Sequence, residues 1–419
     1  MAPADTPRPD AACRRPFRLS IPNSGPAADR RGRVACFSTG GAMTGHLQSR
    51  DITIIGAGVA GLTVALALAQ RGAQVTVLER AGAFREVGAG LQISPNAGRV
   101  LEALGLGPAL DAVSVRSDGV VLHDRGGRQV ARMPLAAHRP GAAFRMIHRA
   151  RLIEVLERAA RAAGVTVALD REVAELPDLP LLIGADGLHS RVRRALNGPE
   201  TPFFTGQTAW RALIPDDPGT PDAYARLFMG PGRHLVSYPL GQGLRNIVAV
   251  VERPDWTAEG WSHQDDPANL RAAFAGFGGK VPGWLARVEQ TGIWGLFRHR
   301  VAPCWQDGQR VILGDAAHPT LPFMAQGAVM AIEDAWTLAA CLDVIPDQAA
   351  ALSRYQTLRV PRVTRVIEAA NSNARNYHLT GPARLLGHAG LRGLSRLAPG
   401  LLMGRFDWIY DHDPLAVRP

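Results

Sequence analysis

The chain has 419 residues, 46% of them hydrophobic and 20% charged, which is the composition of a globular protein with enough chain for a large core. No apolar run reaches the ~18 residues that a membrane span needs, so we expect no integral membrane protein. The formal net charge of +10 comes almost wholly from arginine. It is not arranged as a basic stripe with interleaved aromatic residues, so we expect no nucleic-acid partner.

The first 48 residues differ in composition from the rest of the chain. They are rich in arginine, proline, alanine and glycine, and they lack the apolar core of a secretory signal peptide. Met43 stands just ahead of the first predicted strand. We therefore interpret residues 1–42 as a disordered or misannotated leader, with translation starting at Met43, and we count the whole segment 1–48 as lying ahead of the first domain. An arginine-rich transit peptide is the alternative.

The first predicted elements form a βαβ unit, which is the start of a parallel sheet. The sequence predicts a strand over 51–56, a helix buried on both faces over 59–71, and a second strand over 74–79. A GxGxxG loop made by Gly56, Gly58 and Gly61 joins the first strand to the helix.

This loop predicts a dinucleotide site. Gly56 permits the tight turn, Gly58 lets the backbone approach a pyrophosphate, and Gly61 lets the helix pack close to the sheet. The pyrophosphate is expected at the helix N-terminus, where free N–H groups and the helix dipole favour negative charge. Glu79 ends the second strand at the spacing of an acid that binds a ribose. Ala60 and Arg80 are assigned to the same site.

A mixed region leads to the second motif. It is predicted to hold a loop and helix over 88–105, two strands around a turn over 113–135, an amphipathic helix over 149–163, and strands over 165–169 and 179–184. The last strand runs into Gly184-Ala185-Asp186-Gly187. Asp186 can hold this loop by accepting backbone N–H bonds, and Arg191 can offset phosphate charge. A tight turn with an ion pair is the alternative interpretation.

The texture of the sequence changes between residues 202 and 295. Short strands, proline and glycine turns and most of the tryptophans lie here, which predicts a mostly antiparallel sheet. A buried strand over 311–314 then returns, and helices are predicted over 326–342 and 349–377.

The strand over 311–314 delivers the third motif. Gly314 and Asp315 follow it, and the Asp315 carboxylate can reach a sugar hydroxyl of a cofactor. Pro322 fixes the path of the next loop. Gly327 and Ala328 then open a helix whose N-terminus can face the pyrimidine edge of a flavin, which becomes negative on reduction.

Glycine and cysteine spacing limit the further cofactors. No second GxGxxG occurs in the sequence, so one tightly bound dinucleotide is expected, and a nicotinamide cofactor is expected to visit a shared cleft. The four cysteines show neither CxxC spacing nor a cluster with histidine, so we expect no metal site and a reducing cytoplasm. They are Cys13, Cys36, Cys304 and Cys341.

Together these motifs resemble the single-component FAD-dependent aromatic hydroxylases, the group that includes p-hydroxybenzoate hydroxylase, and in particular the salicylate hydroxylase-like members. The resemblance covers residues from about 51 to 380. The segments that carry it are 88–101, 148–156, 184–193, 210–215, 232–240 and 314–335.

The resemblance implies an α/β fold. A Rossmann-like FAD-binding domain with a parallel sheet is expected over 49–201 and 296–380, and a mostly antiparallel β-sheet lobe for the substrate over 202–295. A C-terminal helical tail is expected over 381–419. Packing of this tail on the core or on a second subunit is favoured over contact with a membrane surface.

The resemblance also implies a reaction. FAD would be bound tightly, with Arg149 among its ligands, and NADH or NADPH would bind transiently, with the Asp186 loop contributing. The enzyme would use O2 to hydroxylate a small phenolic or hydroxybenzoate-type substrate through a C4a-hydroperoxyflavin. A related monooxygenase of a larger secondary metabolite, quinone or carotenoid is the alternative. A cytoplasmic monomer or homodimer is expected.

Two residues of the sheet lobe are predicted to act on the substrate. His234 and Tyr238 lie four apart in a predicted strand, so they share one face of the sheet. The resemblance implies that His234 is the base or hydrogen-bond partner of the substrate hydroxyl and that Tyr238 orients it. A structural histidine on the sheet is the alternative. Arg211 or Arg233 could bind a substrate carboxylate, although an exposed arginine is favoured for each.

Overall fold

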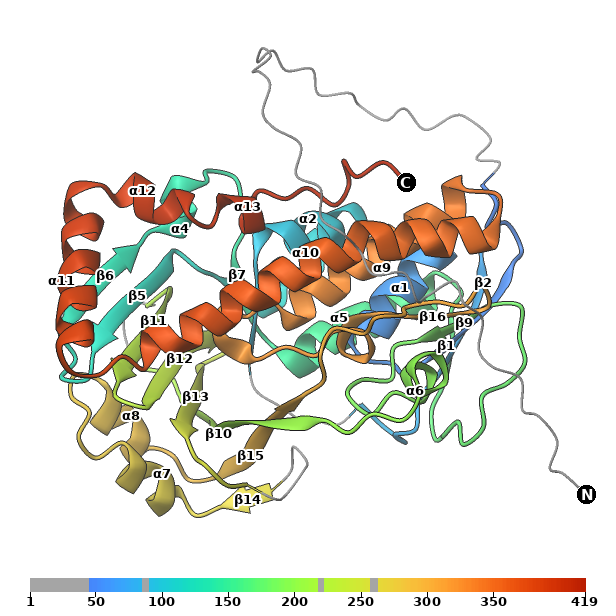
Figure 1. Cartoon of the computed structure of the whole chain (residues 1–419). Coiled ribbons are helices and arrows are strands. Elements are labelled where there is room, and N and C mark those ends of the chain that lie inside the picture. Colours follow the sequence, from blue (N-terminus) through green and yellow to red (C-terminus); the bar gives the residue numbers. More distant parts are fainter. Residues whose placement is uncertain (1–44, 85–89, 218–221, 257–262) are drawn as a thin grey trace, which may run out of the picture.

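The computed structural model describes residues 45–84, 90–217, 222–256 and 263–419, so the predictions for residues 1–44 lie outside the described part. A five-stranded parallel sheet forms one end of the molecule (Figure 1). Its strand order is β16-β9-β1-β2-β8, so β9 and β16 lie on one side of β1 and β2 and β8 lie on the other. The strands are β1 (Asp51–Ile55), β2 (Gln74–Leu78), β8 (Thr166–Ala168), β9 (Leu182–Gly184) and β16 (Arg310–Ile312).

Helix α1 (Val59–Ala69) is buried on nearly all sides, as its apolar sequence predicts. It packs between α5 (Arg149–Ala162) and α9 (Gly327–Val344). The chain then turns toward β2 at Gly72, whose φ of +96° suits glycine. The long helix α10 (Gln348–Tyr377) packs on α9 and runs from the parallel sheet to a second, larger sheet (Figure 1).

The larger sheet has eight strands in the order β14-β15-β10-β13-β12-β11-β5-β6. All neighbouring strands are antiparallel except β11 and β5, so the expected mostly antiparallel sheet is confirmed. The strands are β5 (Gly119–Asp124), β6 (Gln129–Met133), β10 (Phe203–Pro215), β11 (Tyr224–Gly230), β12 (Arg233–Gly241), β13 (Leu244–Glu252), β14 (His263–Asp265) and β15 (Thr291–Arg298). Strands β5 and β6 belong to this sheet although they lie within 49–201, the range predicted for the FAD-binding domain. The domain boundaries stay a prediction.

The two faces of this sheet have different neighbours. Alternate residues such as Trp210, Leu235 and Ala249 pack under the short helices α7 (Pro267–Ala273) and α8 (Val281–Ala286). The residues between them point to the opposite face, which packs against the loop before α9 and the end of α10. We call this second face the inner face.

Smaller elements fill the space between the two sheets and around them. A three-stranded sheet has the order β3-β7-β4, and β7 leads directly into α5. The remaining elements are β3 (Gly90–Ile93), β4 (Ser114–Arg116), β7 (Arg145–His148), α2 (Pro95–Ala103), α3 (Gly107–Val113), α4 (Leu135–His138), α6 (Arg191–Asn197), η2 (Gly314–Ala316) and η3 (Pro322–Met324).

The C-terminal segment folds back over the molecule. Helix α11 (Gly381–Leu397) packs on β6, and α12 (Pro399–Gly404) and α13 (Asp407–Tyr410) carry the chain back to α2 (Figure 1). Leu402, Met403 and Ile409 are buried in these contacts. Among the described residues, no helix is both long enough and apolar enough to span a bilayer.

Candidate active site

The three glycine-centred motifs meet at the carboxyl ends of three adjacent parallel strands. Strand β1 leads into Gly56, β9 into Asp186, and β16 into Asp315. Backbone hydrogen bonds join the loops: Ala185 N donates to Ile55 O at 2.8 Å, and Leu313 N donates to Gly184 O at 3.1 Å. The chain crosses from one side of β1 to the other here, which is where open α/β sheets bind ligands.

Three glycines of the first loop fit a bound pyrophosphate for different reasons. Gly56 has a φ of +100°, and a Cβ on it would lie 2.4 Å from the oxygen of Ala185. A Cβ on Gly61 would lie 1.9 Å from the oxygen of Gly56, so α1 could not approach the loop. A Cβ on Gly58 would meet no atom within 4 Å, which leaves open space over the N-terminus of α1.

Glu79 braces this loop from the end of β2. Its Oε2 accepts a hydrogen bond from Ala57 N at 2.8 Å, and its Oε1 accepts one from Ala81 N at 2.9 Å. Each carboxylate oxygen can accept a second bond, so the side chain can still bind ribose hydroxyls. Arg80 follows directly and is exposed.

Asp186 holds the second loop together. Its Oδ2 accepts a hydrogen bond from Arg191 N at 2.8 Å, while Oδ1 is buried without a hydrogen-bond partner among the described residues. Burial raises the pKa of this carboxyl, and the bonds from Ser190, Arg191 and Val192 oppose the rise. The Arg191 guanidinium turns away to Glu172 and to the Ala174 carbonyl.

Asp315 lies in the third loop, close enough to Arg149 to feel its charge. The Asp315 side chain is accessible to solvent although protein surrounds it. The loss of surrounding water raises the Asp315 pKa, and the charges of His318 and Arg149 oppose this rise. A Cβ on Gly314 would lie 3.0 Å from the Cβ of Ala60, so the first and third motifs are in contact. An accessible carboxylate in such a recess suits the sugar or ribityl hydroxyls of FAD.

The loop after Asp315 ends at the N-terminus of α9. Pro322 begins the short helix η3, and Ala325 takes a left-handed conformation with a φ of +53°. Gly327 and Ala328 are the first residues of α9, an 18-residue helix. Its unpaired N–H groups and dipole can therefore stabilise a negative charge at this point, as the sequence predicts.

A buried network of charged side chains joins α9 to α10. Glu333 and Asp334 are fully buried and pair with Arg359 at 2.8 and 2.7 Å. Burial favours a raised Glu333 pKa, but Arg359 and Arg362 hold it at about 2. Asp334 also accepts a hydrogen bond from Gly314 N, which ties the third motif to the network. These acids therefore belong to a packing network.

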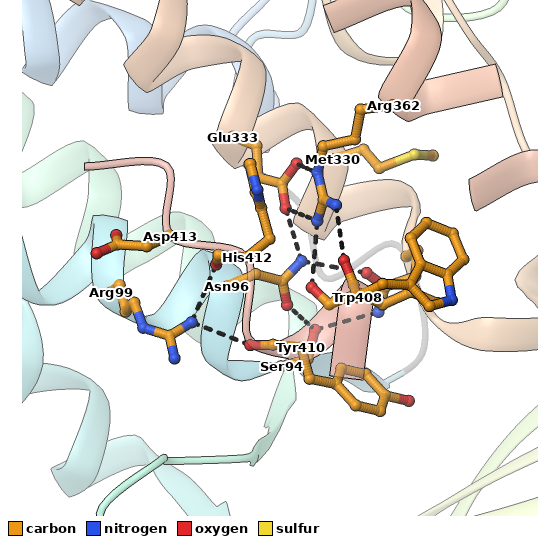
Figure 2. A network of polar contacts seen from close by, with 12 residues as sticks. Ser94, Asn96, Arg99, Met330, Glu333, Arg362, Trp408, Tyr410, His412 and Asp413 are labelled. Atoms are coloured by element: carbon orange, nitrogen blue, oxygen red, sulfur yellow. Dashed lines mark hydrogen bonds and ion pairs between the residues drawn. The ribbon is translucent and has the colours of Figure 1, made fainter. Parts of the chain in front are cut away.

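The same network anchors the C-terminal segment (Figure 2). Asn96 of α2 donates to Glu333 at 2.7 Å, and Arg362 turns toward Glu333 from α10. Arg362 also donates to the carbonyls of Trp408 and Ile409. The network thereby links the C-terminal segment to α9 and α10.

His234 and Tyr238 lie on the inner face of the large sheet, as their spacing predicts. Strand β12 pairs His234 with Val250 and Tyr238 with Asn246 on β13. The His234 ring contacts Phe323 of η3 edge-on, with 5.4 Å between ring centroids. The Tyr238 ring lies against Gly90 of β3. The sheet therefore presents both side chains to the loops that carry the cofactor residues.

Burial determines the protonation of both side chains. Burial, with a further contribution from His378, holds the His234 pKa well below its ordinary value, so the ring is neutral at neutral pH. Burial raises the Tyr238 pKa, which Arg211 and a hydrogen bond with Gln92 oppose. Neutral imidazole can accept a proton, whereas this tyrosine is a hydrogen-bond partner.

The two candidate arginines point to opposite faces of the sheet. The Arg233 guanidinium donates to the Ala273 carbonyl under α7. Arg211 stacks over Trp294, with 4.3 Å from Cζ to the ring centroid, and burial lowers its pKa to about 10. Tyr238 and Arg149 both influence the Arg211 pKa, so Arg211 lies beside the candidate site. Its side chain is half-buried, whereas the sequence favoured an exposed arginine.

Two side chains beside His234 were not predicted from the sequence. His378, at the end of α10, lies 2.7 Å from His234 between ring nitrogens, and Glu252, at the end of β13, lies 2.6 Å from His378. His234 and His378 are 144 positions apart, so no spacing pattern could have indicated this contact.

Comparison with known proteins agrees with this geometry. Residues 49–178 and 179–370 match the FAD binding domain family. The 3-amino-4-hydroxybenzoate 2-monooxygenase of Streptomyces platensis is 36% identical over 392 residues, which cover 87% of this chain and 97% of that protein. The 3-hydroxybenzoate 6-hydroxylase 1 of Aquipseudomonas alcaligenes is 32% identical over 393 residues, which cover 87% of this chain and 98% of that protein.

A solved structure gives the same result. Klebsiella pneumoniae HpxO, complexed with FAD and uric acid, superposes with a TM-score of 0.72 at 25% identity, covering 87% of this chain and 98% of HpxO. The expected fold class, family and cofactor are thus confirmed. The chain belongs to the FAD binding domain family and is an FAD-dependent aromatic-ring monooxygenase that uses NADH or NADPH.

Proposed function

We propose that this enzyme hydroxylates a small phenolic acid of the hydroxybenzoate type, with O2 as the oxygen source. The observation that carries the proposal is the inner face of the large sheet, where His234, Tyr238 and Arg211 face the loops of the cofactor half. The two relatives from Streptomyces platensis and Aquipseudomonas alcaligenes are named for an aminohydroxybenzoate and a hydroxybenzoate, which favours a small ring over a larger metabolite.

Sheet register supports a single substrate touching all three side chains. Val236 lies between His234 and Tyr238 on the inner face, and it pairs with Val248 on β13, which pairs with Arg211 on β10. Arg211 is therefore two strands away from β12, about 9.5 Å across the sheet. A benzoate ring carries its carboxylate and hydroxyl on different edges, as this arrangement requires.

Charge supports a carboxylate at Arg211. Arg149 is close enough to Arg211 for its positive charge to lower the Arg211 pKa. An anion between two partly desolvated cations is stabilised more than it would be in water. We therefore assign the substrate carboxylate to Arg211, with Arg149 shared between substrate and cofactor.

The remaining side chains orient and activate the ring. His234 accepts the proton of the phenolic hydroxyl, because the phenolate is the electron-rich form that attacks an electrophilic oxygen. Tyr238, held by Gln92, donates or accepts a hydrogen bond that fixes the ring plane. The apolar side chains of Leu321, Phe323 and Trp294 exclude water from the same space.

FAD, when bound, supplies the activated oxygen. Gly58 and the N-terminus of α1 would hold its pyrophosphate, Glu79 its ribose, and Asp315 its sugar hydroxyls. The N-terminus of α9 at Gly327 and Ala328 would face the flavin ring, and Asp186 would hold the loop beside it. We further propose a cytoplasmic monomer or homodimer.

A substrate panel tests this function. Hydroxybenzoates, aminohydroxybenzoates and hydroxypyridine carboxylates are compared with the matching phenols that lack a carboxyl group. We expect an aromatic acid to stimulate NADH oxidation together with stoichiometric formation of a hydroxylated product. If no aromatic acid raises NADH oxidation above the rate of uncoupled peroxide release, the proposal is wrong.

A further inference from the structure

A line of three titratable side chains leads from the substrate half of the site to the surface. Building on the proposed role of His234, we propose that His378 and Glu252 form a proton relay with it. This relay carries the phenolic proton of the substrate from the buried ring to solvent, so His378 and Glu252 assist the reaction without touching the substrate.

The geometry of the line is continuous. His234 Nδ1 lies 2.7 Å from His378 Nε2, and His378 Nδ1 lies 2.6 Å from Glu252 Oε1. His234 is 2% exposed and His378 is 6% exposed, whereas the Glu252 side chain is 53% exposed. Three separate elements, β12, α10 and β13, thus place one donor–acceptor chain between the core and bulk water.

The carboxylate at the outer end determines both tautomers. An ionised Glu252 can only accept a hydrogen bond, so His378 carries its proton on Nδ1 and donates it. His378 Nε2 then carries a lone pair and accepts a hydrogen bond from His234 Nδ1–H. His234 is left with a lone pair on Nε2, which is the form that a base for the phenol needs.

The proton moves by three linked transfers. The phenolic O–H bond breaks as His234 Nε2 takes the proton, and His234 Nδ1–H passes to His378 Nε2. His378 Nδ1–H passes to Glu252, which releases a proton to water. The net change is one phenol converted to phenolate and one proton in solvent. The reverse movement reprotonates the product oxygen and restores both tautomers.

The other neighbours of His234 do not offer a second route. Phe323 packs against one side of its ring, and Tyr377 lies on another with its hydroxyl donated to the Phe323 carbonyl. Among the titratable groups described, His378 is the one whose charge influences the His234 pKa. Glu252 is the one whose charge and hydrogen bond influence the His378 pKa.

The charge balance of the line also suits transfer. Burial lowers the His378 pKa, and Glu252 opposes this through a hydrogen bond and its charge. His378 is therefore neutral at rest, yet a passing positive charge is stabilised by the carboxylate beside it.

The test measures proton release when a phenolic substrate identified by the panel binds to the oxidised FAD-loaded enzyme, by stopped flow with a pH indicator. The variants are His378→Gln, Glu252→Gln and His234→Gln. Glutamine at 378 can keep an acceptor near the Nε2 position and so preserve the His234 tautomer, but it cannot pass on a proton. His388→Gln, another buried histidine, and Glu368→Gln, an exposed glutamate of α10, are the matched controls.

We expect His378→Gln to slow proton release by on the order of 10²-fold, with FAD content and substrate affinity retained. Glu252→Gln should slow it by less, because Glu252 is the solvent-exposed end of the line and water can replace its carboxylate there. The controls should match wild type. If His378→Gln misfolds, the Glu252→Gln rate and its solvent isotope effect decide.

Two results would overturn different claims. If His378→Gln and Glu252→Gln release the proton at the wild-type rate while His234→Gln does not, the relay is wrong and the proposed role of His234 stands. If His234→Gln also releases the proton at the wild-type rate, the proposed role of His234 fails and the relay fails with it.

Discussion

The two halves of the active site are built in different ways. The cofactor half is a backbone structure, in which glycine loops at the ends of β1, β9 and β16 create the space for a dinucleotide. The substrate half is a side-chain structure, in which residues from β10, β12, β13 and α10 converge on the inner face of a sheet. Local sequence therefore specifies the first half, and long-range packing specifies the second.

The largest expected effect comes from two glycines of one loop. Gly61→Ala puts a Cβ 1.9 Å from the Gly56 oxygen, so we expect a loss of about 3 kcal/mol of stability and little bound FAD. Gly58→Ala meets no protein atom within 4 Å, so its stability without FAD should equal wild type while its FAD affinity falls. Thermal unfolding and FAD titration of both variants check this.

The contrast between the two variants is the informative result. If Gly58→Ala binds FAD as tightly as wild type, the open space over the N-terminus of α1 is not the pyrophosphate site. If both variants are equally unstable without FAD, the difference between a packing glycine and a binding glycine is wrong.

A smaller effect is expected in the substrate half. Arg211→Leu should raise KM for an aromatic acid by roughly tenfold to 100-fold, because a charged hydrogen bond to the carboxylate is lost. It should change KM little for the matching phenol without a carboxyl group. Arg233→Leu is the control on the opposite face of the same sheet. Equal changes for acid and phenol would contradict the assignment of Arg211.

The smallest expected effect is the contribution of one histidine to acid stability. Burial lowers the pKa of His412 to about 4, against about 6.5 in an unfolded chain. The unfolded state binds the proton first, so the free energy of unfolding falls as the pH drops from about 6.5 to 4. His412→Gln should flatten this slope in urea unfolding. Parallel curves for both proteins would show that His412 does not contribute.

Much of the fold could be predicted because its signals are local. The strand over 74–79 and the helix over 349–377 occur as Gln74–Leu78 and Gln348–Tyr377, since period and end signals mark each one. The pairing of β5 with β11, which brings β6 into the same sheet, could not be predicted. About a hundred residues separate these two parallel strands, and neither strand carries a sequence pattern that indicates its partner.

The candidate site divides in the same way. The spacing of His234 and Tyr238 predicted that they share a face, and the sheet register agrees. His378 and Glu252 are 126 positions apart and meet only through the packing of α10 on the sheet. Arg211 was expected to be exposed, because the sequence does not reveal that Trp294 stacks on it from the neighbouring strand.

The most direct test of the account is the ultraviolet spectrum of a bound hydroxybenzoate, measured on the oxidised FAD-loaded enzyme near neutral pH without reductant. We predict that wild type binds the phenolate form and that His234→Gln binds the neutral phenol with FAD still in place. Neutral phenol in both proteins, or phenolate in both, would contradict the claim that the inner face of the large sheet activates the ring through His234.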